Sequence, residues 1–435
     1  MFFNILEIIQ KKQNKEELSK EEIEFFINGY TNDLIPDYQI SALVMAIFIN
    51  GMSERETTDL TIAMANSGKV LDLSTLGEIF VDKHSTGGVG DKVSLILLPI
   101  VASLGVPVAK MSGRGLGFTG GTVDKLQSIP GYITDITMDD FLSNVKKLGI
   151  SIISQTHDLA PADKKLYALR DSISCVESIP LIASSIMSKK IASGAQKIVI
   201  DVTVGNGAFM KNMDEARKLA KMMIEIGKLA NRETVCILTN MDEPLGYAVG
   251  NNLEVKEAIS FLNGNMPEDL ADVVFSLGAY MLKLSGKGQD IEENKNLMRE
   301  AVLSGKAYKK FEELVKNQGG DISYIQNPEK FEKAKFVKRV ESTYEGYVEE
   351  IPAEEFGKLA SFLGAGRMKK EDDIDFSVGI VLNKKVGEYV KKGDTLFTVF
   401  ANDEEKAGFV ENKGLKIIKI GDVKKDVKYV YEVIE

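Results

Sequence analysis

Two glycine-rich stretches, each placed between a short apolar run and a helical pattern, constrain the fold of this chain most strongly. Ile79–Val81 opens into KHSTGGVGDK, which is followed by a helical pattern over Val93–Leu104. Pro107–Met111 opens in the same way into SGRGLGFTGGT. We expect a strand before each stretch, and later strands over Ile150–Ser154, Lys197–Val202 and Thr234–Thr239 with helices between them.

Alternation of strands and helices is typical of an α/β domain with a mostly parallel sheet. In such sheets, ligands bind beyond the carboxyl ends of the strands. Because both glycine-rich loops follow strands, we expect both loops at that edge of the sheet, where they could close around one ligand.

The chain of 435 residues exceeds the ~250–300 residues at which single hydrophobic cores stop growing, so we expect several domains. The N-terminal part carries helical patterns with two capping-box pairs, Ser19 with Glu22 and Ser53 with Glu56. β-rich segments and turn signals mark a change of character from Phe336. The predicted fold class is α/β, with a helical α-domain in two parts (1–66 and 161–193), a large α/β domain in two parts (67–160 and 194–335) and a small C-terminal α+β domain (336–435).

Composition narrows the choice of partners and of location. The net charge of −10 argues against nucleic-acid binding, although a local cationic pocket can still bind a small anion. No segment reaches the ~20 consecutive apolar residues that span a bilayer, so we expect no membrane insertion. Cys175 and Cys236 lie far apart in apolar or small-residue surroundings, which favours buried reduced thiols and a cytoplasmic location. With only two histidines, His84 and His157, and no cysteine cluster, a zinc site is not expected.

The residues of both loops suit a phosphate group. Glycines allow backbone N–H groups to approach an anion, and the N-terminus of a following helix favours negative charge. Two independent tight turns would also use glycine, but polar donors accompany the glycines in both loops. Those donors are Lys83, Ser85 and Ser94 at the first loop, and Lys110, Ser112 and Thr122 at the second.

These stretches carry a resemblance to a known family. Lys83–Ser94 and Ser112–Thr122, with the Asp124-Lys125-Leu126 that follows, resemble the signature region of thymidine and pyrimidine-nucleoside phosphorylases. The resemblance covers nearly the whole chain, and such long, ordered matches are specific. It extends through Tyr167–Asp171, Ser178–Ile182 and Asp242–Asn251.

The resemblance implies a three-part subunit, assembled as a homodimer, in which phosphate binds on the α/β domain and the pyrimidine on the α-domain. The cleft between the two domains has to close for the reaction. The implied residues are a phosphate-binding set of Lys83, Ser85, Ser94, Ser112 and Thr122, with Lys110 beside it, and a base-binding set of His84, Arg170, Ser185 and Lys189.

Taken singly, the members of the base-binding set have plainer explanations. Ser185 and Lys189 are four residues apart and share a helix face, where a lysine is ordinarily a solvated charge. Arg170 alone could be an ion-pair partner, and His84 alone could be a structural loop residue. The resemblance favours a functional role for all four.

The reaction that the resemblance implies breaks the C1′–N1 bond of a pyrimidine nucleoside while phosphate attacks C1′. Negative charge develops on the ring, where Arg170 and Lys189 can stabilise it and Ser185 can hydrogen-bond the ring edge. His84, with an ordinary pKa of about 6.5, can donate a proton or a hydrogen bond to a ring oxygen. His84, Arg170 and Lys189 are therefore the expected catalytic residues, and no cofactor or protein nucleophile is required.

Position 92 bears on a possible metal site. The resemblance implies that some members of the family bind potassium through the equivalents of Gly90, Leu245, Ala248 and Glu257, together with a threonine at position 92. In this chain position 92 is a lysine. We expect the Lys92 ammonium to replace the ion by pairing with Glu257 and nearby carbonyls. The alternative is an exposed lysine with potassium still bound.

Other departures and alternatives complete the prediction. By the resemblance, Phe118 stands where many relatives have histidine, which removes a polar group near the site and could alter the pocket or its pH response. Thr203 stands where lysine is common, which we interpret as a structural change. Val108–Met111 resembles the broad-specificity branch, so uridine, thymidine and deoxyuridine are all expected substrates, with a strict thymidine phosphorylase as the alternative.

An anthranilate-type phosphoribosyltransferase would need magnesium and paired acidic residues, for which we find no clear motif. A non-catalytic nucleoside-binding module would bind without turnover.

Overall fold

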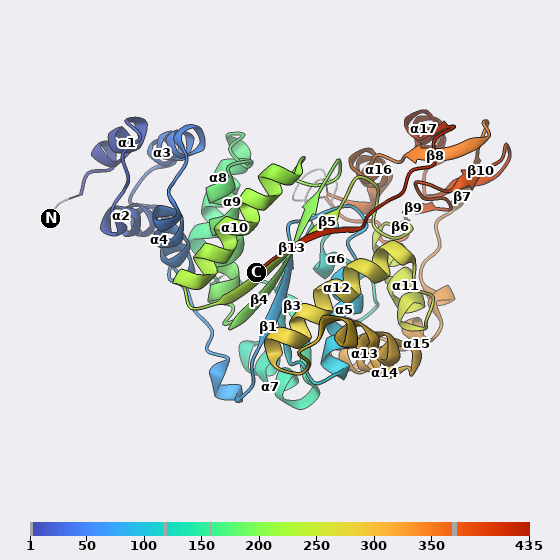
Figure 1. Cartoon of the computed structure of the whole chain (residues 1–435), viewed down its shortest axis with the longest axis horizontal. Helices are drawn as coiled ribbons and strands as arrows, with labels where there is room; N and C mark the ends of the chain where they lie inside the picture. Colours follow the sequence, from blue (N-terminus) through green and yellow to red (C-terminus); the bar gives the residue numbers. More distant parts are fainter. Residues whose placement is uncertain (1–2, 116–119, 157, 368–371) are drawn as a thin grey trace.

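The computed structural model describes residues 3–115, 120–156, 158–367 and 372–435. Six helices gather at the N-terminal end of the molecule (Figure 1). The two helices that come later in the sequence, α8 and α9, pack against α2 and α4, so the two helical segments form one unit. These helices are α1 (Ile5–Gln13), α2 (Lys20–Thr31), α3 (Asp37–Asn50), α4 (Glu54–Ala65), α8 (Pro161–Ser172) and α9 (Ile179–Ala192).

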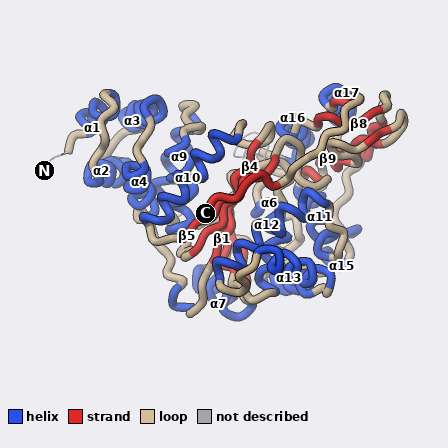
Figure 2. Tube along the Cα trace, viewed as in Figure 1, coloured by secondary structure: helices blue, strands red, loops and turns tan. Residues whose placement is uncertain are grey.

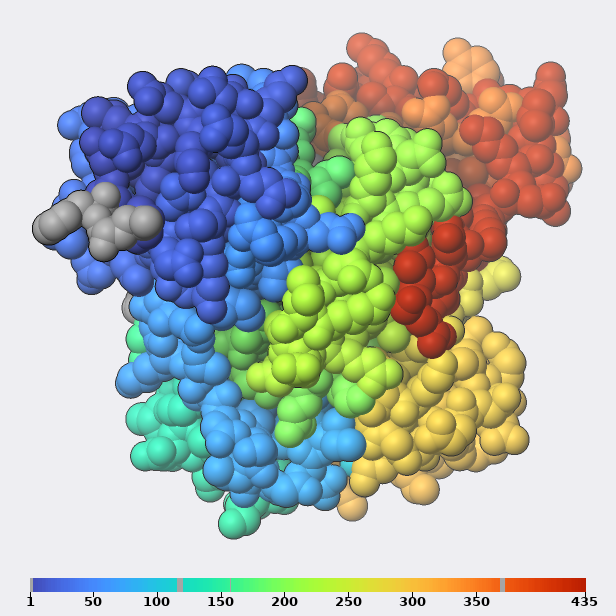
Figure 3. Space-filling model, turned by 60° about the vertical axis from the view of Figure 1, so that its left-hand side comes forward, coloured from blue at the N-terminus to red at the C-terminus, as the bar shows by residue number. Residues whose placement is uncertain are grey.

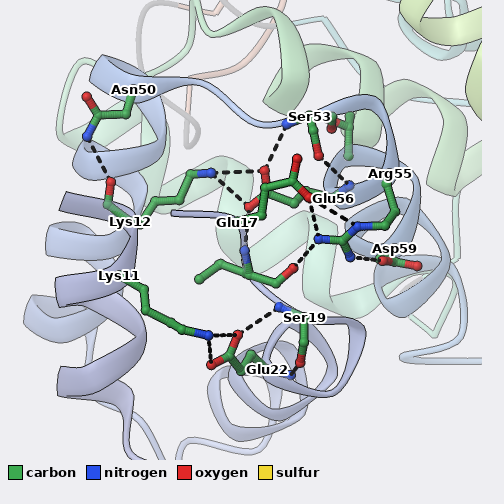
Figure 4. A network of polar contacts seen from close by, with 12 residues as sticks. Lys11, Lys12, Glu17, Ser19, Glu22, Asn50, Ser53, Arg55, Glu56 and Asp59 are labelled. Carbon is green, nitrogen blue, oxygen red and sulfur yellow. Dashed lines mark hydrogen bonds and ion pairs between the residues drawn. The ribbon is translucent and has the colours of Figure 1, made fainter. Parts of the chain in front are cut away.

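Buried polar contacts hold the first helices together (Figure 4). Both predicted capping boxes are present, because Ser19 and Ser53 each exchange hydrogen bonds with the glutamate three residues later. Glu56 also forms a buried ion pair with Lys12 of α1, with 2.8 Å between Nζ and Oε1. One glutamate therefore caps its own helix and ties it to another.

A four-stranded sheet forms the centre of the molecule, with helices on both of its faces (Figure 2). The strand order is β1-β4-β5-β13, and the first three strands are parallel, which confirms the predicted mostly parallel sheet. Two more parallel strands, β2 and β3, pair with each other. The strands are β1 (Val81–Ser85), β2 (Val108–Ser112), β3 (Ile150–Ser154), β4 (Lys197–Val204), β5 (Glu233–Asn240) and β13 (Val430–Ile434).

Side chains of the central strands alternate between two hydrophobic cores. Val199 and Ile237 pack in a core with α5 and α12, whereas Ile198 and Ile200 pack in a second core with α9 and α10. A period of two is what a strand covered on both faces requires. The helices of the α/β part are α5 (Val93–Ser103), α6 (Thr122–Gln127), α7 (Met138–Leu148), α10 (Met213–Leu229), α11 (Asn251–Leu262), α12 (Glu268–Ser285), α13 (Ile291–Leu303), α14 (Lys306–Asn317) and α15 (Ser323–Gln326).

The C-terminal part contains two small sheets, with strand orders β6-β9-β11-β7 and β10-β8-β12. Strand β6 comes from the α/β part and pairs antiparallel with β9, so the two parts share a sheet. The strands of the two sheets and the helices of the C-terminal part are β6 (Ala248–Val249), β7 (Phe336–Glu341), β8 (Gly346–Glu350), α16 (Ala353–Ala360), β9 (Gly379–Leu382), β10 (Tyr389–Val390), β11 (Thr395–Ala401), α17 (Glu404–Ile417) and β12 (Lys419–Gly421).

Two details differ from the sequence-based expectation. Strand β13, which falls within the expected C-terminal domain, returns to the central sheet and pairs antiparallel with β5. Figure 3 shows these last residues (red) on the surface between the green and yellow segments. Strand β1 begins at Val81 and continues through Ser85, so Lys83, His84 and Ser85 belong to the strand rather than to the loop. Polar residues are tolerated there because their charges are paired, as described below.

Among the helices of the described residues, none combines the length and the apolar character that crossing a membrane requires.

Candidate active site

Strand β1 places Lys83 shortly before the first glycine-rich loop (residues 86–92), in a buried position between two carboxylates. Its Nζ lies 3.8 Å from Asp91 Oδ1 and 3.7 Å from Asp201 Oδ2. These are ion-pair distances, and among the described residues Nζ finds no hydrogen-bond partner. A buried ammonium with unused donors is unusual, because desolvation of a charge is costly without such bonds. Lys83 therefore retains donors for an anion.

The two carboxylates beside Lys83 differ in their titration. Burial raises the pKa of Asp201 to about 6. Burial also opposes ionisation of Asp91, but the charges of Lys83 and Lys125 outweigh it and lower the pKa of Asp91 below its ordinary value. Asp91 therefore stays ionised to a lower pH than Asp201 and is the stronger ion-pair partner of Lys83.

The second glycine-rich loop spans residues 113–121, of which 113–115 and 120–121 are described, and its Gly120 lines one small pocket together with Gly90 of the first loop. Lys125, in α6 just after the second loop, donates from Nζ to the carbonyl oxygen of Asp91 in the first loop, at 2.5 Å. Ser112 ends β2 before the second loop, and Thr122 begins α6 after it. Ser94 lies in the first turn of α5, where free N–H groups favour an anion. The structure thus brings the two predicted loops together.

A buried charge cluster that the sequence analysis missed lies behind these loops. Asp82 accepts from Lys110 Nζ at 3.1 Å through Oδ1 and from Lys190 Nζ at 2.5 Å through Oδ2. Lys110 also donates to the carbonyl oxygen of Lys83. Burial lowers the pKa of Lys110 to about 7 despite the neighbouring Asp82. Lys110 is therefore engaged by Asp82 beneath the site, and Asp82 links β1, β2 and α9.

Helix α9 carries the predicted pair of Ser185 and Lys189, which do share one face. Lys189 Nζ donates to Ser185 Oγ at 2.9 Å and to Asp163 Oδ2, on α8, at 2.6 Å. Ser185 is buried, whereas Lys189 is partly exposed. Asp163 was not singled out from the sequence, since its partner is 26 residues away. The carboxylate holds the lysine ammonium beside the serine hydroxyl.

Arg170, at the end of α8, is buried and directed at backbone carbonyls. It donates to the carbonyl oxygens of Cys175, Val176 and Leu181, at 3.2, 2.7 and 3.1 Å. Burial lowers the pKa of its guanidinium below the ordinary value. These three bonds fix the connection between α8 and α9, which is a structural role in addition to any contact with a ligand.

The pKa of His84 is shifted by nearby lysines on β1, β2 and α9. Burial and the neighbouring charges of Lys190, Lys110, Lys189 and Lys83 lower the pKa of His84 well below 6.5. The expectation of an ordinary pKa is therefore wrong, because a further positive charge beside these four lysines is unfavourable. A neutral imidazole can donate a hydrogen bond but is a poor source of a proton.

Lys92, at the end of the first loop, is fully buried. Its Nζ donates to Leu245 O at 2.7 Å, to Ala248 O at 3.0 Å and to Glu257 Oε2 at 2.7 Å. The ammonium thus occupies the centre of the oxygen atoms that the sequence analysis assigned to a possible cation site. The backbone N–H of Lys92 also donates to Gly90 O.

Two further residues were singled out from the sequence near this loop. Thr203 Oγ1 donates to Gly87 O at 2.5 Å and lies 2.9 Å from Thr86 Oγ1, so the threonine braces the first glycine-rich loop. Phe118 lies outside the described residues.

Family models match the three parts of the chain in order. A helical bundle domain of the glycosyl transferase family matches residues 6–68, and an a/b domain of that family matches residues 77–308. The C-terminal domain of pyrimidine nucleoside phosphorylase matches residues 347–421.

Individual relatives agree. The pyrimidine-nucleoside phosphorylase of Geobacillus stearothermophilus is 53% identical over 401 residues, covering 92% of this chain and 93% of the relative. That of Bacillus subtilis (strain 168) is 54% identical over 400 residues, covering 92% of each. Among solved structures, anthranilate phosphoribosyltransferase from Thermus thermophilus matches with a TM-score of 0.60 and 18% identity, covering 72% of this chain and 99% of that one. This last likeness shows the fold alone.

The helical bundle joined to an α/β domain with paired glycine-rich loops defines a glycosyl transferase. Within that class, the chain belongs to the pyrimidine-nucleoside phosphorylase family, which confirms the resemblance found in the sequence. An anthranilate-type transferase is not favoured, because the C-terminal domain and the much higher identities point to the phosphorylases.

Proposed function

We propose that this chain catalyses the reversible phosphorolysis of pyrimidine nucleosides to free base and (deoxy)ribose 1-phosphate, in nucleoside salvage. The observation that carries the proposal is the buried Lys83 ammonium, which has no hydrogen-bond partner among the described residues and lies where two glycine-rich loops meet. The relatives named as pyrimidine-nucleoside phosphorylases support the same reaction.

Phosphate would bind at the two loops. Lys83 would supply charge and hydrogen bonds, and the hydroxyls of Ser85, Ser94, Ser112 and Thr122 would donate to the remaining oxygens. Lys110 would not contact the phosphate, since its ammonium is engaged by Asp82, but its positive charge would attract the anion. Phosphate needs positioning rather than activation, because it is already an anion at neutral pH.

The base would bind against α9 and β1. As C1′–N1 breaks, N1 keeps the electron pair, and the ring charge is stabilised by Lys189 and Arg170. Ser185 would hydrogen-bond the ring edge, and neutral His84 would donate a hydrogen bond to a ring oxygen. A phosphate oxygen forms the new bond to C1′, and the departing base is protonated from solvent once the cleft reopens. Closing the domains would exclude water and favour phosphorolysis over hydrolysis.

Broad substrate specificity is the favoured version of the proposal. The Val108–Met111 stretch, which resembles the broad-specificity branch, supports uridine, thymidine and deoxyuridine as substrates. A strict thymidine phosphorylase would keep the reaction and exclude the ribose 2′-hydroxyl.

We also propose that the enzyme needs no metal ion. The oxygen atoms of Leu245, Ala248 and Glu257 are already hydrogen-bonded to the Lys92 ammonium. A potassium ion would have to displace a buried, well-paired charge, so these residues do not fit the ion.

A homodimer is the proposed assembly, formed through the N-terminal helices. Several large apolar side chains of this region are exposed, and covering them with a second copy would remove apolar surface from water. They are Leu34, Tyr38, Met45, Phe48 and Ile49, at 79, 74, 39, 38 and 71% exposure.

Cys175 and Cys236 are both buried and free, which supports a cytoplasmic location.

The test is to incubate the purified protein with uridine, thymidine or cytidine, with and without phosphate and without added metal, and to measure free base. Phosphate-dependent release of uracil and thymine is expected. Release of thymine alone would narrow the specificity to thymidine. Release without phosphate would indicate a hydrolase, and absence of any release would contradict the proposal.

A further inference from the structure

The segment of residues 244–248, between β5 and α11, lies directly against the first glycine-rich loop. The N–H of Leu245 donates to Val89 O at 3.0 Å. Gly90 has a φ of +75°, and a Cβ there would lie 2.5 Å from Leu245 O. The loop backbone therefore takes its shape against this segment, and a shift of the segment would shift the loop.

Two buried lysines hold the carbonyl groups of this segment in alternation. Lys92, from the first loop, takes Leu245 O and Ala248 O. Lys385, from the C-terminal part just after β9, donates to Pro244 O at 2.5 Å and to Gly246 O at 3.1 Å. The segment is thus bound to the loop by one ammonium and to the C-terminal part by the other.

Two carboxylates accept hydrogen bonds from the backbone N–H groups of the same segment. Glu257 accepts from the N–H groups of Tyr247 and Ala248 and pairs with Lys92. Asp269 accepts from the N–H of Gly246 and pairs with Lys385 at 2.9 Å.

Glu243 lies 3.4 Å from Lys385 Nζ and completes its surroundings. Burial disfavours the charge on Lys385, but Asp269 and Glu243 outweigh it and raise the pKa of the lysine above its ordinary value. Lys385 is therefore a fixed cation at neutral pH.

We infer that Lys385 is a positioning residue that fixes the first glycine-rich loop from the C-terminal part, and thereby sets the affinity of the enzyme for phosphate. The inference rests on the proposed function. Removing the ammonium leaves Asp269, Glu243 and two carbonyls buried without their partner, so the segment has to rearrange. The backbone N–H groups of the loop, and Ser94 in the helix that follows it, then lose their alignment, whereas Ser185 and Lys189 on α9 keep theirs.

The decisive variant is Lys385→Met, which keeps the length of the apolar stem and removes the charge. Lys392→Met, at an exposed position of the same part, is the matched control. In Lys385→Met we expect the KM for phosphate to rise by about tenfold or more while the KM for nucleoside stays within about twofold. Protection against thermal unfolding by added inorganic phosphate should weaken in parallel. The control should match the wild type in all three measurements.

A milder variant covers the case in which Lys385→Met does not fold. Glu243→Gln removes one of the two carboxylates around Lys385, and a rise of about threefold in the KM for phosphate is expected. An unchanged KM for phosphate with unchanged phosphate protection, or equal rises in both KM values, would overturn the inference.

The proposed function fails separately, through absence of phosphate-dependent base release by the wild type. In that case, the inference is still tested by comparing the thermal protection that added phosphate gives the wild type with the protection that it gives Lys385→Met.

Discussion

His84 is the residue whose chemistry depends most directly on its surroundings. Burial and the charges of Lys83, Lys110, Lys189 and Lys190 lower its pKa well below 6.5. A histidine with a lowered folded-state pKa binds fewer protons than the unfolded chain, so its contribution to stability is lost as pH falls below about 6.5. We expect His84 to stay neutral from pH 6 to 8, and a histidine NMR titration should detect this.

The chain contains only one other histidine, so the assignment is direct. His157→Gln leaves a single imidazole signal, which should keep its neutral chemical shift throughout the titration. A midpoint near 6.5 for that signal would contradict the predicted neutral state and would restore a proton-donating role for His84.

Lys92 leads to a prediction on ion dependence. The wild type should turn over equally fast in potassium and in sodium buffers, because the ammonium already pairs with Glu257 and two carbonyls. Lys92→Thr removes that charge and leaves the oxygen atoms free for an ion. We expect this variant to lose at least about tenfold in activity in sodium buffer and to regain part of it in potassium.

Steady-state rates in the two buffers, with Lys392→Met as the control, provide the measurement. A wild type that requires potassium would show that the ion binds despite the lysine.

Short-range contacts within the candidate site could be predicted from the sequence, but the residues that support the site could not. Ser185 and Lys189 are one helical turn apart, so their contact follows from the sequence alone. Asp82 and Lys190 are separated by 108 residues, and neither stands in a glycine-rich loop or beside a recognisable donor set. Only the packing of α9 against the sheet brings them together. The lowered pKa of His84 has the same origin.

At the scale of secondary-structure elements, α1, α2 and α4 offer a matched comparison of two ion pairs. Glu56 and Glu22 are both capping-box glutamates, and each pairs with a lysine of α1. The Lys12–Glu56 pair is almost fully buried, with side chains 4 and 1% exposed, whereas Lys11 of the other pair is 39% exposed. Their different burial should separate their energies.

Glu56→Gln should therefore destabilise the protein far more than Glu22→Gln. Leaving Lys12 buried without its carboxylate should cost about 3–5 kcal/mol, while the more exposed pair should contribute about 1 kcal/mol or less. Thermal unfolding midpoints of the two variants, compared with the wild type, provide the measurement. Equal midpoints would mean that solvent reaches Lys12 in the variant.

The elements themselves were predicted unevenly, for physical reasons. Apolar runs located β2, β3, β4 and β5 to within two residues at either end. The polar end of β1 looked like a loop, because the ion pairs that permit Lys83 to lie in a strand involve Asp91 and Asp201, which only the fold places nearby. Strand β13 is a half-buried edge strand whose partner, β5, lies almost 200 residues earlier in the sequence, so local pattern could not assign it to the central sheet.

At the scale of the whole molecule, the N-terminal helices carry an apolar face that the other described parts of the chain leave uncovered. Leu34, Tyr38 and Ile49 are each more than 70% exposed, on or beside α3. An isolated subunit would keep this surface in water, whereas a two-fold symmetric pair of copies would bury the same patch on both. Because α9, which carries Ser185 and Lys189 of the base-binding set, packs against α4 of the same helical unit, such a pair would also hold the α-domain in place.

The proposed dimer predicts that the wild type sediments as two chains of 47.8 kDa each. Replacing Tyr38 and Ile49 together with glutamate places two charges on each copy of the face, and desolvating them on association is costly. The double variant should therefore sediment as a monomer at micromolar concentration and keep its thermal midpoint. Val337→Glu with Val423→Glu changes two exposed apolar residues of the C-terminal part and should leave the dimer intact. A dimer that survives the first double variant would place the interface elsewhere, because no stable contact buries four unpaired carboxylates at its centre.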